Sequence, residues 1–148
     1  MVDSADLTER LQRADFLRDV SPASLAKIAR IAERESFAEG DAIYQLGDPA
    51  EDLFIVESGR IRFALGVGNR GGTSGSVISQ GQVVGWAAVL EDQPRLLATA
   101  VCLEDSQVIR INGAKLLAVF DHDTTSGYAV MRRLATMIAH DLTEVLTA

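Results

Sequence analysis

The stretch from Phe37 to Gly59 reads FAEGDAIYQLGDPAEDLFIVESG, and it is the part of the sequence that decides the fold. Glycines mark three turns in it, and apolar pairs fill the segments between them. Asp41 and Asp48 each follow a glycine, where a short carboxylate side chain can hydrogen-bond within the turn. The pattern predicts short strands joined by sharp corners, as in a β-barrel scaffold, and by itself it indicates no ligand.

Strand-like runs and turns continue on the C-terminal side of this stretch. Runs rich in β-branched and aromatic residues recur at about ten-residue spacing. They are Ala42–Leu46, Leu53–Glu57, Arg60–Val67, Ser76–Ser79, Leu97–Leu103 and Gln107–Ile111. Such spacing favours an antiparallel barrel or jelly roll over alternating βαβ units. The predicted fold class is therefore mainly β, with a β-roll over residues 36–111.

Helical patterns precede the β-rich region. Apolar residues first recur at helical spacing at Leu7, Leu11 and the Phe16–Leu17 pair. Ser21 and Pro22 then have the pattern of an N-cap followed by proline at the first helical position. We expect this second helix to end near Glu35, which gives N-terminal helices over residues 1–35.

Helix returns after the β-rich region, over residues 112–148. A short helix is predicted over Ala114–Phe120, and a longer one from about Thr124 to the end. The apolar residues of the longer helix follow steps of three and four: Tyr128, Met131, Leu134, Ala135, Ile138, Leu142 and Val145. This face fits either packing on the barrel or a seam between two helices of a homodimer. Because no linker or internal repeat divides the sequence, we expect a single domain over residues 1–148.

The composition is that of an ordinary globular protein, and it excludes several classes of function. Hydrophobic residues make up 47% and charged residues 24%, and 21 acidic against 14 basic residues give a formal charge of −7. A protein that binds nucleic acid or anionic lipid needs a basic surface, so we expect neither partner. The sequence has no signal-peptide pattern or membrane-spanning apolar run, and its single cysteine excludes an internal disulfide. We therefore expect a cytoplasmic protein.

Motifs for catalysis and metal binding are missing from the sequence. The segment Gly66–Gly71 has GxGxxG spacing, but the glycine-rich residues after it disfavour the helix that a dinucleotide site needs, so we predict a hairpin loop. His122 and His140 are the only histidines and have no metal-ligand spacing. A cupin-like enzyme would need histidines among the strands, where there are none. We predict no enzyme activity, no catalytic residue, no metal and no cofactor.

At Phe37–Gly59 the sequence resembles the cyclic nucleotide-binding domain family, the sensor of catabolite-activator-type regulators, protein kinase A regulatory subunits and cyclic-nucleotide-gated channels. The shared pattern is phenylalanine and glycine-acidic, then isoleucine-aromatic and glycine-acidic, then leucine-aromatic-isoleucine-valine before the last glycine. The resemblance extends over roughly Phe16 to Val145. It implies a jelly-roll-like β-roll, or double-stranded β-helix, with N-terminal helices before it and a long C-terminal helix after it.

The family's phosphate-binding cassette is matched in part by residues 81–100, GQVVGWAAVLEDQPRLLATA. In the family, a short helix after a glycine offers backbone N–H groups to the cyclic phosphate, an arginine neutralises that phosphate, and a glutamate accepts from the ribose hydroxyl. The resemblance implies the following ligand-binding residues here: Gly85, Trp86, Ala87, Ala88, Arg95, Ala98 and Thr99.

The cassette departs from the family pattern at two points. Trp86 stands where the family has its glutamate, and an indole has one donor and no acceptor for the ribose. It can instead fill the pocket as a core aromatic, or stack on a purine. Two leucines separate Arg95 from Ala98, one residue more than in the commonest family form. If a bulge absorbs the extra residue, Arg95 points inward; otherwise Arg95 is a surface cation and Leu96 takes its place.

The resemblance implies a non-catalytic sensor or regulatory domain that binds a cyclic nucleotide, cAMP by default or cGMP, and signals through its C-terminal helix. The alternative is a degenerate, ligand-free domain that acts as a dimerising protein-interaction module. The two differ in whether the pocket beneath Gly85–Ala88 is open or filled by Trp86. Members that bind DNA carry a helix-turn-helix after the long helix. This sequence ends at Ala148 without one, so we expect no direct nucleic-acid binding by this chain.

Overall fold

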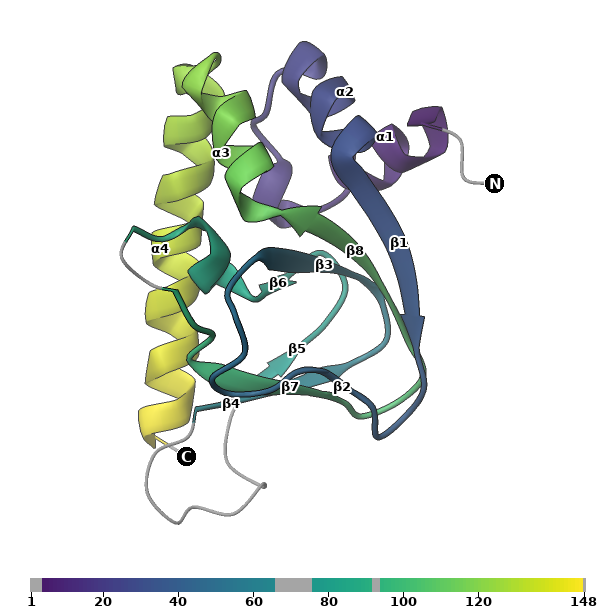
Figure 1. Ribbon diagram of the computed structural model, residues 1–148, viewed down its shortest axis with the longest axis vertical. Coiled ribbons are helices and arrows are strands. Elements are labelled where there is room, and N and C mark those ends of the chain that lie inside the picture. The colour runs from purple at the N-terminus through teal and green to yellow at the C-terminus, as the bar shows by residue number, and fades with distance from the viewer. Residues whose placement is uncertain (1–3, 66–75, 92–93, 148) are drawn as a thin grey trace.

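The computed structural model describes residues 4–65, 76–91 and 94–147, and it forms a β-roll with helices at one end and along one side (Figure 1). The N-terminal helices are α1 (Ser4–Gln12), the short 3-10 helix η1 (Asp15–Leu17) and α2 (Pro22–Ile31). Ser21 caps α2, because its side-chain oxygen accepts from the Ser24 N–H at 3.3 Å, as the sequence predicts.

Eight strands form two antiparallel four-stranded sheets among the described residues. The first sheet has the order β1-β8-β3-β6, and the second has the order β2-β7-β4-β5. In chain order the strands are β1 (Ala32–Phe37), β2 (Ala42–Tyr44), β3 (Asp52–Ser58), β4 (Ile61–Leu65), β5 (Ser76–Ile78), β6 (Val83–Val84), β7 (Ala98–Cys102) and β8 (Ser106–Asn112). The mainly β class and the jelly-roll architecture that the sequence predicts are confirmed.

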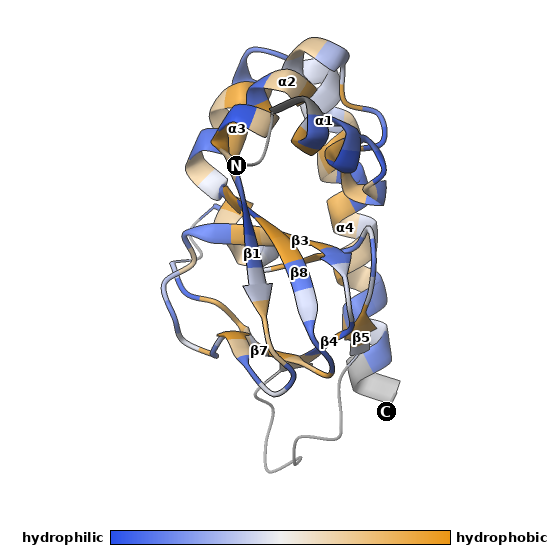
Figure 2. Cartoon of the chain, turned by 90° about the vertical axis from the view of Figure 1, so that its right-hand side faces the viewer, coloured by the Kyte–Doolittle hydropathy of each residue, from blue (hydrophilic) through white to orange (hydrophobic). Residues whose placement is uncertain are grey.

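The core lies on both faces of the first sheet. β3 has four consecutive buried residues, Leu53 to Val56. In an antiparallel strand with one solvent-exposed face, buried and exposed residues would alternate. One face of this strand packs into the roll and the other lies beneath the helical layer. Figure 2 shows hydrophobic colour along β3 and β8, between the helices and the second sheet.

The predicted turn chemistry between Phe37 and Gly59 is confirmed. The Asp41 carboxylate accepts from the Ala38 N–H at 2.9 Å, and the Asp48 carboxylate accepts from the Gln45 N–H at 2.9 Å. Each acid therefore closes the turn that begins three residues before it. At Gly59, φ is +102° and a Cβ would overlap the Ser106 side chain, so only glycine fits this corner.

The predicted end of the second helix is wrong. α2 ends at Ile31, and residues 32–37 form β1, which pairs with β8 from Ala32 opposite Ile111 to Phe37 opposite Ser106. The strand prevails because long-range ladder hydrogen bonds and cross-strand charge pairs stabilise it. Arg110 on β8, for example, donates to the Glu35 carboxylate on the neighbouring β1 at 2.8 Å. The roll thus begins at Ala32 rather than at Ser36.

The β-region also contains one strand that the sequence did not predict and one predicted loop that lies outside the described residues. The two-residue strand β6 is absent from the prediction, because so short a run carries no periodic signal. The GxGxxG segment at residues 66–71 lies outside the described residues, and so does the end of the predicted strand Arg60–Val67.

Two helices follow the roll, α3 (Gly113–Asp121) and α4 (Thr124–Thr147), as the sequence predicts. α4 runs the length of the molecule beside the roll (Figure 1). Its start is tied to α2, because the Asp123 carboxylate accepts from the hydroxyls of Ser21, Ser24 and Ser126 at 2.6–2.7 Å. These hydrogen bonds, with that of Ser126 the strongest, hold the pKa of Asp123 well below its ordinary value.

Over the described ranges, no helix has the length and apolar character needed to span a bilayer. In that same part of the chain, no cluster of three or more His, Cys, Asp or Glu side chains is arranged to hold a metal ion.

Candidate functional site

The segment that resembles the phosphate-binding cassette lies between β6 and β7, where the 3-10 helix η2 (Trp86–Val89) follows Gly85. Gly85 has φ +79°, and a Cβ there would lie 2.9 Å from the Asp52 carbonyl oxygen on β3. Its N–H donates to the Tyr44 hydroxyl oxygen at 2.9 Å. Glycine is therefore required for this sharp approach of the cassette to two strands of the roll.

Trp86 points into the roll. Its side chain is 5% exposed, and its ring centre lies 6.0 Å from that of Phe63 on β4. Its indole Nε1 is buried without a hydrogen-bond partner among the described residues. Of the two roles that the sequence leaves open for Trp86, the structure shows the core aromatic.

The space left beneath the cassette is very small. The cavity there has a volume of about 10 Å³, and its walls come from Tyr44, Phe63, Gly85, Trp86, Ala87, Leu96, Leu97 and Ala98. A water molecule requires about 10–15 Å³ of such space, and small-molecule sites usually have about 300–1,000 Å³. This conformation of the roll therefore has room for about one water and none for a nucleotide.

Arg95 lies on the surface, where its Nη1 donates to the Gly47 carbonyl oxygen at 2.9 Å. Backbone pairing fixes this orientation. The Leu96 N–H donates to the Asp48 carbonyl at 2.8 Å, and the Gly47 N–H donates to the Leu96 carbonyl at 2.9 Å. Successive side chains of paired backbone point to opposite sides, so Leu96 is buried against the cavity. The structure thus follows the alternative in which Leu96 takes the inward place.

The structure brings together only part of the predicted set. Gly85, Trp86, Ala87 and Ala98 surround the small cavity. Three residues of the set do not line it: Ala88, Arg95 and Thr99. The Thr99 hydroxyl accepts from the Leu46 N–H at 3.0 Å and stabilises the β2–β7 edge.

Tyr44 is a residue of this site that sequence reasoning missed. Its ring stacks on Phe54 with centres 5.9 Å apart, and its hydroxyl holds Gly85. Burial is the main cause that raises the pKa of Tyr44 above its ordinary value, and the negative charge of Asp141 on α4 adds to it. The aromatic at position 44 belongs to the motif, but no sequence signal showed that it meets the cassette.

This arrangement defines a class of protein: a β-roll with a glycine-led short helix between its strands and a long helix after it. Residues 34–123 match the cyclic nucleotide-binding domain family. The chain belongs to the cyclic nucleotide-binding domain family.

Two relatives and one solved structure illustrate the likeness. The chain is 33% identical over 107 residues to a cAMP-dependent protein kinase regulatory subunit of Colletotrichum orbiculare, covering 68% of this chain and 26% of that protein. It is 29% identical over 115 residues to the cyclic AMP receptor protein of Thermus thermophilus, covering 77% of this chain and 47% of that protein. This chain therefore spans less than half the length of either relative.

The structural likeness covers almost the whole chain. The sensor domain of the transcriptional regulator DNR from Pseudomonas aeruginosa superposes with a TM-score of 0.79 at 19% sequence identity. The match covers 96% of this chain and 95% of that one. At this identity the likeness concerns the fold, which is that of a β-roll with flanking helices.

Proposed function

We propose that this chain is a non-catalytic regulatory domain whose roll is closed to cyclic nucleotides and which acts as a dimerising protein-interaction module through α4. The closed cassette carries this proposal. Trp86, Phe63 and Leu96 occupy the interior, and about 10 Å³ remains. The glutamate that would bind a ribose is replaced by a residue without an acceptor.

A partly exposed apolar stripe along α4 supports the second half of the proposal. Its residues follow steps of four, three and four, the spacing of a two-helix seam: Met131, Ala135, Ile138 and Leu142. Ala135 and Leu142 are exposed, whereas Met131 and Ile138 are half-buried and pack in part against the core; the neighbouring Tyr128 is 67% exposed. Leu134, by contrast, is in the core. The side chain of Val145 lies outside the described residues. The partner is a second copy of this chain, because such a stripe is complementary to itself.

Cyclic-nucleotide sensing is the second candidate function. The family match and the relatives named for cAMP favour it, with cAMP as the default ligand and cGMP as the other. It requires Trp86 to leave the roll and Arg95 to release the Gly47 carbonyl and turn inward. Occupancy would then shift α4, whose Asp141 carboxylate acts electrostatically on the Tyr44 hydroxyl that holds Gly85.

Calorimetric titration separates the two functions. We expect no saturable heat when cAMP or cGMP is titrated into the folded chain up to millimolar concentration, which corresponds to a binding free energy weaker than about −4 kcal/mol. Saturable micromolar binding that Arg95→Ala abolishes would establish the sensor function and overturn the closed-roll proposal.

Sedimentation equilibrium tests the seam. We expect a dimer that Leu142→Glu dissociates, because the substitution places a charge in an apolar interface. Ala139→Glu is the matched control, since Ala139 is an exposed α4 residue off the stripe. A chain that stays monomeric at high micromolar concentration, or a dimer that Leu142→Glu leaves intact, contradicts the seam.

A further inference from the structure

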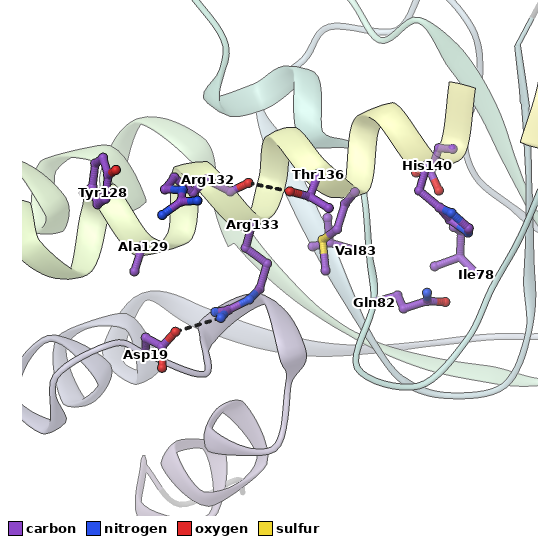
Figure 3. Close-up of a pocket in the computed structure, with 12 residues that line it drawn as sticks. Asp19, Ile78, Gln82, Val83, Tyr128, Ala129, Arg132, Arg133, Thr136 and His140 are labelled. Atoms are coloured by element: carbon purple, nitrogen blue, oxygen red, sulfur yellow. Dashed lines mark hydrogen bonds and ion pairs between the residues drawn. The ribbon is translucent and has the colours of Figure 1, made fainter. Parts of the chain in front are cut away.

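A groove that is separate from the cassette runs along α4. It has a volume of about 640 Å³ and lies between α4, the end of η1, β5 and the start of β6 (Figure 3). This volume falls within the range of about 300–1,000 Å³ that small-molecule sites occupy. The stripe proposed as the dimer seam contributes no residue to the groove. Tyr128, which neighbours the stripe, does line the groove, so the two sites adjoin.

One end of the groove carries excess positive charge. Arg133 Nη2 donates to the Asp19 carboxylate at 2.7 Å, while its Nη1 is buried without a hydrogen-bond partner in the described part of the chain. Arg132 lies beside it, with its guanidinium 5.8 Å from the centre of the Tyr128 ring. Only Arg133 pairs with Asp19, and its buried Nη1 donor points to a missing acceptor.

The other end of the groove holds a largely buried carboxyl group. Asp141 lines the groove and is 5% exposed. Burial raises the pKa of Asp141 to about 6, while His140 lowers it and Glu144 raises it, both on α4. From β2, Tyr44 interacts electrostatically with the same carboxylate. At neutral pH the group is largely ionised, and a hydrogen-bond donor in the groove would stabilise this poorly hydrated carboxylate.

Between these ends the groove is apolar. Ile78 and Val83 are buried in its floor, and Met137 is half-buried in its α4 wall. Arg133 and Asp141 lie eight helical steps apart, which at a rise of about 1.5 Å per step gives about 12 Å. An extended chain advances about 1.2 Å per bond, so about ten bonds join the two ends.

We propose that this groove binds an elongated amphiphile with an acid group at one end and a hydrogen-bond donor at the other. The acid binds Arg132 and the unpaired Nη1 of Arg133, the apolar body lies over Ile78, Val83 and Met137, and the donor binds Asp141. The orientation is fixed by charge, because the reversed ligand places two anions together at Asp141 and leaves the Arg133 donor unpaired.

Calorimetry with three ten-carbon probes tests the proposal: 10-hydroxydecanoate, decanoate and 1,10-decanediol, each below its micelle concentration. We expect 10-hydroxydecanoate to bind best. Loss of either end group should weaken binding about tenfold, the usual effect of removing one hydrogen bond to a charged group. Equal affinity for the three probes, or no saturable heat with 10-hydroxydecanoate, overturns the proposal.

Variants locate the ligand. Arg133→Gln should weaken both acids without affecting the diol, and Asp141→Asn should remove the preference for 10-hydroxydecanoate over decanoate. Thr136→Phe fills the groove and should abolish binding, whereas Ala139→Phe, outside the lining, should not. Binding that survives Thr136→Phe contradicts the site, provided that circular dichroism shows the variant to be folded.

Fluorescence of the single tryptophan distinguishes binding in this groove from binding at the cassette. Trp86 lies in the roll and does not line the groove, so its fluorescence should stay constant during the titration. A change in Trp86 emission that tracks binding places the ligand in the roll and overturns the assignment. The cyclic-nucleotide titrations described above use different ligands, so the closed-roll proposal stands or falls on its own result.

Discussion

The substitution Trp86→Ala tests whether the Trp86 side chain fills the interior of the roll. A nearly fully buried tryptophan removes about 200 Å² from water, which at about 25 cal/mol per Å² is about 5 kcal/mol. The indole N–H has no partner among the described residues, and removing such a group recovers about 1–3 kcal/mol. We therefore expect Trp86→Ala to lower the free energy of unfolding by about 3 kcal/mol.

The matched control is Trp86→Phe, which keeps an aromatic ring against Phe63 and removes the unpaired N–H. We expect its free energy of unfolding to change by less than about 1 kcal/mol, because the two effects offset each other. Urea denaturation followed by circular dichroism measures both variants, since neither retains a tryptophan signal. A cost below about 1 kcal/mol for Trp86→Ala, or equal costs for the two variants, would refute the argument that this side chain fills the roll.

Three further predictions concern single residues. Gly85→Ala should lower the free energy of unfolding by more than Gly47→Ala in thermal melts, because both have positive φ but only at Gly85 would a Cβ meet a carbonyl oxygen, at 2.9 Å. Asp123→Asn should destabilise at pH 7, and the difference from wild type should shrink as pH falls below about 4, since a lowered pKa stabilises only above its unfolded value. Asp141→Asn should do the opposite: its carboxyl has a raised pKa, so ionisation destabilises the fold as pH rises from about 4 to 6, and the variant should be more stable than wild type at pH 7 but not at pH 4. Denaturation series across pH check both acids, and a constant difference at all pH values contradicts either one.

The strands and helices with strong local signals were predictable. The glycine-acid corners of Phe37–Gly59 appear as predicted, because turn chemistry is decided within a few residues. β1 was not predictable, because the local sequence of Ala32–Phe37 favours the end of a helix and only pairing with β8 makes it a strand. Likewise, the two-residue strand β6 exists only through its pairing with β3.

The candidate site also has features that the sequence predicted and features that it left open. The sequence placed Gly85 at the cassette turn and showed that Trp86 lacks an acceptor, because both follow from the chemistry of a single residue. It left open which side of the chain Arg95 faces. That choice depends on the pairing of residues 94–96 with residues 47–50, a contact between segments more than forty residues apart.

The sequence by itself determined the class of fold, the turns and the helices on either side of the roll, because local spacing and side-chain chemistry decide these. Only the tertiary structure decided that Trp86 and Leu96 fill the roll, that Arg95 lies outside it, and that Arg133 and Asp141 face one groove. Each of these depends on which distant segments meet, and burial and pairing at long range have no signature in the local sequence.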